Sequence, residues 1–439
     1  MSSKEADERN EQNNKKRELT PRLRFPEFKK NRNWELKPLG EIAHILNEKA
    51  GSKKLTLLSI TTGVGLVSQI EKFGREIAGA QYKNYYVIQQ NDFAYNKSST
   101  KEFPEGFVAM YRGNEDGAVP SSIFTCFRVR AGASHPPYLN YLFANNFHGK
   151  WLKRFITIGA RAHGSLNIDD KDLLTIPLPV PSREEQQKIA YCLSSFDELI
   201  TAETQKLNNL NTHKKSLMQQ LFPAEGETLP KLRFPEFGEA GTWMEVTLND
   251  VCERVMDGTH FSPASKSGPY LYLTSKNIRS GALVLDDVSY ISEEEHHDIF
   301  TRCPVKKNDL LLTKDGASTG NCTLNPLDFE FSLLSSVAVI RGNQEKILQA
   351  FLAQDFQSPH LQDQISDAIS GQAITRITLE KIKRFKVWFT NFKEQQKIAD
   401  CLSSLDKLIT AQTQKIDTLK AHKKGLMQQL FPVLEEARR

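Results

Sequence analysis

The feature that most constrains this chain is an internal repeat with an offset of 209 residues. The string LRFPEF begins at Leu23 and again at Leu232, and a 39-residue segment that starts with EQQKIA occupies Glu185–Pro223 and again Glu394–Pro432. The two 39-residue segments differ at only 10 positions. Because one unit is present twice, the chain is expected to fold into two related halves.

Both 39-residue segments have the pattern of a coiled-coil helix. Apolar residues follow an alternating spacing of four and three positions, which Glu203 and Lys214 interrupt in the first copy and Gln412 and Lys423 in the second. A stripe two residues wide in every seven is narrower than the face that a helix buries against a globular core, and it needs a partner helix. We therefore expect the two helices to pair with each other; the alternative is that each packs separately onto its own globular domain.

Local signals delimit both helices. Ser182 and Asn391 each precede a glutamate by three positions, which is the pattern of a capping box, and each segment ends in Leu-Phe-Pro. Proline lacks the backbone N–H and disfavours the helical conformation at the residue before it, so it ends a helix. At 1.5 Å per residue, about 40 residues form a helix roughly 60 Å long.

The segments between LRFPEF and the helices, residues 29–180 and 238–390, begin alike with Trp34 and Trp243 and then share little sequence. Short β-branched and aromatic runs broken by Gly, Asn and Asp are typical of strands and turns, and helical patches follow them. Each segment is therefore expected to be a mixed α/β (α+β) globular domain. The predicted order is a disordered tail at 1–20, a first globular domain (head 1) at 21–180, a coiled-coil helix at 181–223, a second globular domain (head 2) at 224–390, a second coiled-coil helix at 391–432 and a tail at 433–439.

Composition excludes several classes of protein. Charged residues make up 25% and hydrophobic residues 39% of the chain, as in soluble globular proteins, and no apolar run approaches the ~20 residues of a membrane span. The six cysteines form no CxxC pair, so neither a zinc knuckle nor a disulfide framework is expected, and the chain is assigned to the reducing cytoplasm. The formal charge of +5 permits a polyanionic partner without requiring one.

The sequence contains no complete catalytic motif. A Walker A sequence is absent, and the tripeptide Asn-Pro-Leu at 325–327 lacks the second proline and the aromatic residue of an amino-methyltransferase motif. The adjacent His296 and His297 have no spaced third metal ligand and are interpreted as an exposed polar patch. A self-contained methyltransferase or nuclease is therefore not expected.

Polar residues are concentrated in glycine-bearing loops of both heads. Lys, Arg, Asn, Gln, Ser and Thr are the side chains that contact phosphates and base edges of DNA; the alternative is that these are ordinary solvated loops. The candidate DNA-binding residues are Tyr95, Asn96, Lys97, Ser98, Arg161, His163, Thr274, Ser275, Lys276, Asn277, Arg279, Lys314, Ser318, Thr319, Gln372 and Arg376.

The doubled LRFPEF, the two EQQKIA…LMQQLFP helices and the turns NDFAYNK and NDLLLTKDGASTG give the chain, over about residues 20–432, a strong resemblance to the specificity subunit of type I restriction–modification systems. The resemblance implies that each head reads one half of a bipartite double-stranded DNA target. It also implies that the two helices form an antiparallel intramolecular coiled coil with pseudo-twofold symmetry, which sets the distance between the half-sites. Such a subunit has no catalytic activity of its own and directs adenine methylation or restriction by its partners.

The same resemblance implies which partners the chain has. They are two methyltransferase subunits and motor–nuclease subunits, with S-adenosylmethionine, ATP and Mg²⁺ bound by those partners and no cofactor or metal bound by this chain. Lys214, Lys215, Lys423 and Lys424, in the repeated HKK strings, are candidates for docking the methyltransferases; the alternative is that these residues are duplicated solvated faces. The competing functional class is a coiled-coil adaptor whose two α/β heads bind protein or carbohydrate ligands.

Overall fold

A computed structural model describes residues 19–61, 64–77, 80–156, 164, 166–369 and 375–432. The chain divides into two compact units: unit 1 contains the residues up to Ala202 and those from Ile416 onward, and unit 2 is Glu203–Lys415. Of the predicted tails, residues 1–18 and 433–439 lie outside the described residues. Leu19, in contrast, is buried and forms an antiparallel bridge with Trp34.

Unit 1 contains head 1, whose described residues form two four-stranded sheets and one separate pair of strands. The first sheet has the order β2 (Ala43–Ile45), β9 (Phe124–Val129), β6 (Phe93–Asn96), β7 (Phe107–Met110); the second has the order β4 (Gly65–Ser68), β3 (Thr56–Thr61), β8 (Gly117–Val119), β5 (Tyr86–Ile88); the pair is β1 (Glu35–Pro38) and β10 (Pro177–Val180). The shorter helices of head 1 are η1 (Pro26–Phe28), α2 (Leu39–Ile42), α3 (Gln69–Phe73), η2 (Ala80–Asn84), α4 (Pro136–Ala144), α5 (Phe147–Leu152) and α6 (Asp170–Leu174).

Unit 2 contains head 2, in which the residues that the structure describes form one four-stranded sheet, one three-stranded sheet and two pairs of strands. The four-stranded sheet has the order β12 (Cys252–Asp257), β20 (Val337–Gly342), β17 (Leu310–Thr313), β18 (Cys322–Leu324); the three-stranded sheet has the order β16 (Ser289–Ile291), β13 (Tyr270–Leu273), β19 (Ser332–Leu333); the pairs are β14 (Ile278–Arg279) with β15 (Ala282–Leu283) and β11 (Met244–Thr247) with β21 (Lys386–Phe389). The shorter helices are η3 (Pro235–Phe237), α8 (Leu248–Val251), η4 (Ser275–Asn277), α9 (Glu293–Arg302), α10 (Gln349–Asp355), α11 (Pro359–Ile369) and α12 (Leu379–Lys383).

The two heads share a framework that their sequences do not suggest. The first sheet of head 1 and the four-stranded sheet of head 2 have the same strand order, and in both heads the third strand in that order follows a turn with an asparagine at positive φ, 70° at Asn91 and 69° at Asn308. Asparagine tolerates this conformation better than most residues. The next residue in each turn binds an arginine of the neighbouring strand at 2.6 Å: Asp92 binds Arg128 and Asp309 binds Arg341. The heads differ in their second sheets, which have four strands in head 1 and three in head 2.

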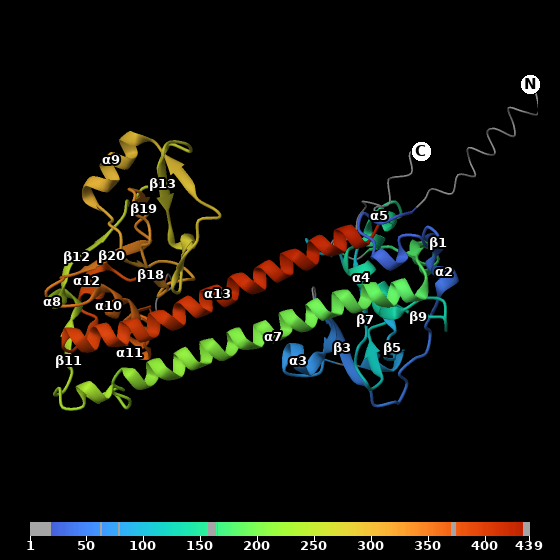
Figure 1. Cartoon of the computed structure of the whole chain (residues 1–439), viewed down its shortest axis with the longest axis horizontal. Helices are drawn as coiled ribbons and strands as arrows, with labels where there is room; N and C mark the ends of the chain where they lie inside the picture. Colours follow the sequence, from blue (N-terminus) through green and yellow to red (C-terminus); the bar gives the residue numbers. More distant parts are fainter. Residues whose placement is uncertain are drawn as a thin grey trace, which may run out of the picture. The chain divides into compact units, whose positions relative to one another are not determined.

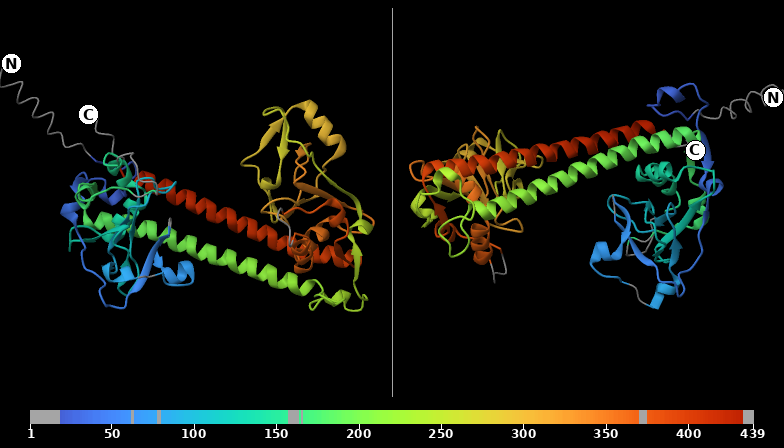
Figure 2. Two further views of the ribbon diagram at one scale, coloured as in Figure 1. Left: turned by 180° about the vertical axis from the view of Figure 1, so that it is seen from behind. Right: turned by 60° about the horizontal axis from the view of Figure 1, so that its bottom comes forward.

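The two long helices are α7 (Arg183–Leu221) and α13 (Phe392–Leu430), each of 39 residues. In unit 1 the start of α7 runs beside the end of α13, and in unit 2 the end of α7 runs beside the start of α13, in opposite directions (Figures 1 and 2). Every residue of the predicted apolar stripe, interruptions included, is buried or half-buried in both helices. The antiparallel coiled coil is therefore confirmed.

Two ion pairs between the helices repeat the 209-residue offset. Lys214 lies 2.6 Å from Asp406 in unit 2, and Lys423 pairs with Asp197 in unit 1. Lys423 occupies the repeat position of Lys214, and Asp406 that of Asp197. Each pair is thus the image of the other with the two helices exchanged, which is the signature of pseudo-twofold symmetry.

Each hydrophobic core combines a head with parts of both helices. In unit 1 the core contains Ile189 and Leu193 from the start of α7 and Leu430 and Phe431 at the end of α13. The core of unit 2 contains the residues at the equivalent positions of the repeat: Ile398 and Leu402 from the start of α13, and Leu221 and Phe222 at the end of α7. The alternative that each helix packs only onto its own head is therefore wrong. Among the described residues, none of the helices is both long and apolar enough to cross a membrane.

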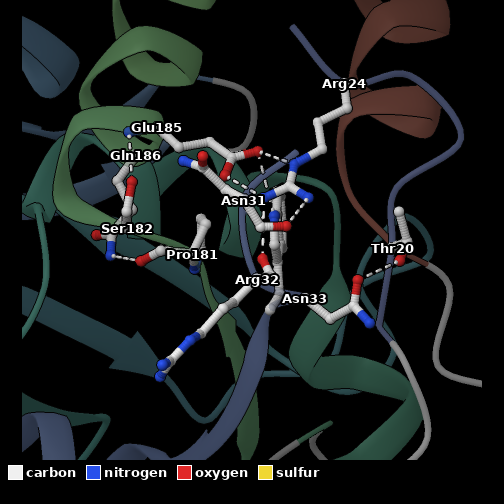
Figure 3. A network of polar contacts seen from close by, with 10 residues as sticks. Thr20, Arg24, Asn31, Arg32, Asn33, Pro181, Ser182, Glu185 and Gln186 are labelled. Atoms are coloured by element: carbon white, nitrogen blue, oxygen red, sulfur yellow. Dashed lines mark hydrogen bonds and ion pairs between the residues drawn. The ribbon is translucent and has the colours of Figure 1, made fainter. Parts of the chain in front are cut away.

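The repeated strings LRFPEF and EQQKIA contact each other. Arg24 forms two hydrogen bonds of 2.8 Å with the carboxylate of Glu185 (Figure 3). Trp34 donates its indole N–H to the same carboxylate at 3.2 Å. The carboxylate raises the pKa of Arg24 by hydrogen bonding. In unit 2 Arg233 binds Glu394 in the same way, at 2.7 and 2.9 Å. Each LRFPEF segment is thereby fastened to the first turn of a long helix.

The same contact changes one detail of the predicted helix caps. The Ser182 hydroxyl accepts the N–H of Glu185 at 3.3 Å, and the Asn391 amide oxygen accepts that of Glu394 at 3.0 Å, as the capping pattern predicts. The Glu185 carboxylate, however, points to Arg24 instead of back to the start of its helix (Figure 3). Glu185, the glutamate of the predicted capping box, thus joins α7 to the first LRFPEF segment.

Candidate nucleic-acid interface

The candidate site in head 2 lies where neighbouring parallel strands end. Strands β13 and β19 are parallel, with Leu273 opposite Leu333, and the chain at Thr259 forms a parallel bridge with Leu334. Parallel segments leave a sheet at the same edge, so the loops that follow these three segments lie together. Loops at the carboxyl ends of parallel strands are a common place for ligand binding in α/β proteins.

Ser336 bonds two of the loops that the sequence predicts to contact DNA, and Lys314 connects them to a third. Its Oγ accepts the backbone N–H of Ser275 at 3.1 Å, and its carbonyl oxygen accepts that of Lys314 at 2.9 Å. The carbonyl oxygen of Lys314 accepts the N–H of Ile377 at 2.9 Å, directly after the third loop. We call this meeting point the Ser336 junction.

The side chain of Lys314 is an internal part of this junction. It is only 2% exposed, and its ammonium lies 3.3 Å from a carboxylate oxygen of Asp257 and 3.4 Å from one of Asp315. Arg376, which is half-exposed, lies 3.6 Å from the other oxygen of Asp315. A buried ammonium needs such partners, because an unpaired charge in the protein interior is costly. Lys314 therefore orders the loops, while Arg376 remains accessible to solvent.

Head 1 repeats two of these backbone connections with a different sequence. Strands β3 and β8 are parallel, and after β8 the carbonyl oxygen of Ile123 accepts the N–H of Lys97 at 2.9 Å. The carbonyl oxygen of Lys97 accepts the N–H of Leu166 at 2.7 Å, and its ammonium lies 3.8 Å from Asp170. Lys97 thus occupies the place of Lys314, with a more exposed side chain.

Two of the predicted residues beside Lys97 lie in a turn, and one lies in the core. Tyr95 is fully buried and donates its hydroxyl to the carbonyl oxygen of Glu105 at 2.8 Å, and burial raises the pKa of its phenol. Asn96 accepts the N–H of Ser98 at 3.0 Å and shapes the turn after β6. The ring of Tyr95 therefore belongs to the core of head 1.

The predicted loop after β13 is shaped by its own side chains. Asn277 is buried, accepts the N–H of Thr274 at 3.0 Å and donates to the carbonyl oxygens of Val284 and Asp287 at 3.1 and 3.0 Å. Lys276 points outward and pairs with the Asp287 carboxylate at 2.8 Å. Exposed ion pairs of this kind contribute little energy, so the ammonium can move to another anion.

The other predicted residues divide into two groups. Arg279 is exposed on β14, and Ser318 and Thr319 are half-exposed in the turn between β17 and β18, where Thr319 donates to the carbonyl oxygen of Gly316 at 2.7 Å. Arg161, His163 and Gln372 lie outside the described residues.

Sequence reasoning missed the serines at the two sheet edges. Ser335 and Ser336 follow β19, and Ser121 and Ser122 follow β8 at the equivalent edge of head 1. A Ser-Ser pair stands just before the strand that carries the framework arginine in both heads, with its distance from that arginine differing by one residue, and this recurrence is the signal that could have identified the serines.

The paired histidines do not form a metal site. His296 is buried, stacks on Tyr270 with ring centroids 3.7 Å apart and hydrogen-bonds Ser332 at 2.9 Å. Its interpretation as an exposed polar residue is therefore wrong. The described part of the chain holds no cluster of three or more side chains that could ligate a metal ion.

The four lysines predicted to dock partners fall into two kinds. Lys214 and Lys423 are 11% and 19% exposed and form the interhelical ion pairs with Asp406 and Asp197. Lys215 and Lys424 are exposed on the outer faces of the same helices. The first two lysines therefore help to hold the coiled coil itself.

These features define a class of protein: a duplicated, two-headed recognition protein with a polar loop junction at an equivalent sheet edge of each head. Comparison with known proteins identifies the family. The model of the type I restriction modification DNA specificity domain matches residues 31–212 and again 240–421. The chain therefore belongs to the type I restriction–modification DNA specificity family.

Individual relatives agree with this assignment. The chain is 24% identical over 410 residues to a putative type I restriction enzyme specificity subunit, MjaX, of Methanocaldococcus jannaschii, covering 91% of this chain and 92% of the relative. Its fold matches the type I restriction-modification system S subunit from M. genitalium with a TM-score of 0.58 at 16% identity, over 95% of this chain and all of the other. It also matches a chain solved in work on complex assembly and conformational transition of the type I R-M system, with a TM-score of 0.53 at 15% identity, over 91% and 97% of the two chains.

Family membership decides the functional class. The chain is a DNA specificity subunit, a recognition protein and not an enzyme, and the family domain does not itself bind a cofactor. A coiled-coil adaptor for protein or carbohydrate ligands is not favoured.

Proposed function

We propose that this chain reads a bipartite double-stranded DNA target, one half with each head, and directs adenine methylation or restriction by partner subunits at that target. The observation that carries the proposal is the equivalent loop junction of both heads, around Ser336 in one and Ile123 in the other. Two junctions with the same backbone connections and different side chains suit two different half-sites.

The side chains at the junction of head 2 suit the chemistry of DNA. Lys276, Arg279 and Arg376 are exposed cations for phosphate contacts, which position a protein on the duplex. The hydroxyls of Ser318 and Thr319 can donate to or accept from base edges, which carry the sequence information. The buried Lys314 holds the loops between these groups in place.

The reaction itself belongs to the partners in this proposal. Two methyltransferase subunits dock on the two equivalent halves of the coiled coil, and motor–nuclease subunits join them. S-adenosylmethionine, ATP and Mg²⁺ are bound by those partners, and the assembly works in the bacterial cytoplasm. The pseudo-twofold repeat supports two equal docking sites, because each outer face of α7 has a counterpart on α13.

The domain limits belong to the proposal as well. Residues 21–180 and 224–390 act as separate recognition modules, and residues 181–223 and 391–432 form the helices between them. The differences between the second sheets of the heads support separate specificities. Exchange of residues 29–180 for the head of another family member should change one half-site only.

The test has two steps. Sequencing of methylated adenines in a host with and without the gene gives the target sequence. Gel shifts with that duplex and with a scrambled duplex, over a range of salt concentrations, then measure affinity and specificity. We expect tighter binding of the target and a log–log decline with salt, since phosphate contacts release counterions. Equal affinity for both duplexes would overturn the proposal.

A further inference from the structure

Phe261 of head 2 is an exposed aromatic residue in the loop after β12. Its side chain is 78% exposed, more than any other large hydrophobic residue among those described. It follows β12 in the loop that runs beside the Ser336 junction. Burial of a phenylalanine normally stabilises a fold, and the exposed Phe261 does not contribute this stabilisation in the free protein.

The backbone that carries Phe261 is held firmly. Thr259 donates its N–H to the carbonyl oxygen of Leu333 at 2.9 Å and accepts the N–H of Ser335 at 2.8 Å. The N–H of Phe261 is donated to the Thr259 hydroxyl at 3.3 Å. A Cβ atom on Gly258 would lie 1.8 Å from the carbonyl oxygen of Leu333, so the loop approaches β19 as closely as only glycine permits. The ring is thus presented on an ordered turn.

The turn stands at the candidate interface. Ser335, which binds Thr259, is the neighbour of Ser336, which binds the Ser275 and Lys314 loops. The same turn begins at Asp257, whose carboxylate pairs with Lys314. The ring therefore leaves the same sheet edge as the exposed cation Lys276.

An exposed apolar ring at the same sheet edge as an exposed cation has a defined use on DNA. Phenylalanine packs against the methyl group of thymine in the major groove, or enters a base step as an apolar wedge. We propose that Phe261 makes the apolar base contact of the half-site that head 2 reads. This inference rests on the proposed DNA-reading function and adds to it a specificity-determining residue.

The test compares Phe261→Ala with Phe329→Ala in the complex of the full chain with its methyltransferases. Phe329 is also exposed in head 2, at 54%, but it precedes β19 and so lies at the opposite edge of that strand. The probes are duplexes with the target found by methylation sequencing, one intact and one with the head 2 half-site scrambled.

We expect Phe261→Ala to weaken binding of the intact target roughly tenfold, the size of one lost base–aromatic contact, and to leave binding of the scrambled duplex unchanged. The factor should be the same at low and high salt, because an apolar contact releases no counterions. Phe261→Leu should retain part of the affinity, and Phe329→Ala should bind as the unaltered chain does.

Three results would overturn the inference: equal affinities of the Phe261→Ala and Phe329→Ala variants, a loss of affinity that also affects the scrambled duplex, or a loss that varies with salt. A lower thermal midpoint of Phe261→Ala would also contradict it, since it would assign the ring a role in folding. Failure of the unaltered complex to prefer its target would instead reject the proposed function.

Discussion

Gln412 donates its side-chain amide to Glu203, at 2.6 Å to the carboxylate and 2.9 Å to the backbone carbonyl oxygen. The two residues lie 209 apart, so they occupy the same position of the repeat and face each other where the two helix copies are related by twofold symmetry. If both copies of the repeat had glutamate at this position, the two carboxylates would repel each other. The substitution of an amide for one carboxylate makes the two helices complementary at this point.

Replacement of the amide by a second carboxylate should destabilise the coiled coil. In Gln412→Glu two carboxylates face each other, and the pKa of one of them rises. In the unaltered protein Lys415 and Gln412 instead lower the pKa of Glu203, so this contact stabilises at neutral pH and is lost as the pH falls below about 4.5. Thermal midpoints of the variant should be lower at pH 7 and approach those of the unaltered chain near pH 4.

The matched control for this variant is Ala421→Glu, which adds a negative charge at an exposed position of the same helix. Its thermal midpoint should stay close to that of the unaltered chain at every pH. An equal effect of both variants would show that added charge, and not the facing position, causes the change.

The Arg24–Glu185 pair should make a large contribution to the stability of unit 1. Arg24→Ala leaves the Glu185 carboxylate, which is 1% exposed, without its cation. Removal of one partner of a buried pair costs about 3–5 kcal/mol. Urea unfolding curves of the variant should show this loss in the free energy of unfolding.

Lys188→Ala is the control for Arg24→Ala, because Lys188 joins the same helix to the same LRFPEF segment through the exposed Glu27 at 3.3 Å. Exposed pairs contribute little, so its unfolding curve should hardly move. Similar losses in both variants would contradict the distinction between the buried and the exposed pair.

Asp355 should make head 2 less stable as the pH rises. It is fully buried, and burial raises the pKa of its carboxyl to about 7 from 3.8. The folded form keeps the Asp355 proton that the unfolded chain loses. The contribution of Asp355 to the free energy of unfolding therefore falls between pH 4 and pH 7 and does not change above that range.

Asp355→Asn removes this dependence. The amide can still accept the N–H of Trp388, which Asp355 accepts at 2.8 Å, and can donate to the Ser358 hydroxyl. Relative to the unaltered chain, the variant should gain roughly 2–4 kcal/mol in the free energy of unfolding at pH 8 and almost nothing at pH 4. Urea midpoints at both values test this; the exposed Asp363→Asn should show no such gain.

The HKK strings allow docking to be separated from coil stability. Lys215→Glu with Lys424→Glu reverses two exposed charges, so it should weaken the methyltransferase assembly that we propose and leave the thermal midpoint unchanged. Lys214→Glu with Lys423→Glu places glutamates beside Asp406 and Asp197, so it should lower the midpoint. Native mass spectrometry and melting curves measure the two effects. Full assembly of the Lys215/Lys424 variant at undiminished affinity would place the docking surface elsewhere.

The architecture could be predicted because its signals are local or repeated. The apolar stripe from Ile189 to Leu221 needs only neighbours three and four positions away, and the 209-residue offset revealed the second copy directly.

The candidate site was predicted in part. Its loops were found from their glycines and polar residues, but Tyr95 and Asn277 were selected as contacts although both are buried. Composition cannot distinguish a polar side chain that shapes a loop from one that faces solvent.

By itself the sequence determined the duplication, the two long helices and the family, because periodicity and repetition are properties of the chain; it predicted the pairing of the helices, which the tertiary structure confirmed. Only the tertiary structure decided which charged groups form ion pairs. Lys314 pairs with Asp257, which is 57 positions away in the sequence, and Arg24 pairs with Glu185, which is 161 positions away. The tertiary structure also gave two heads of different sequence one framework, since backbone hydrogen bonds between strands depend on their order in the sheet and only weakly on side-chain identity.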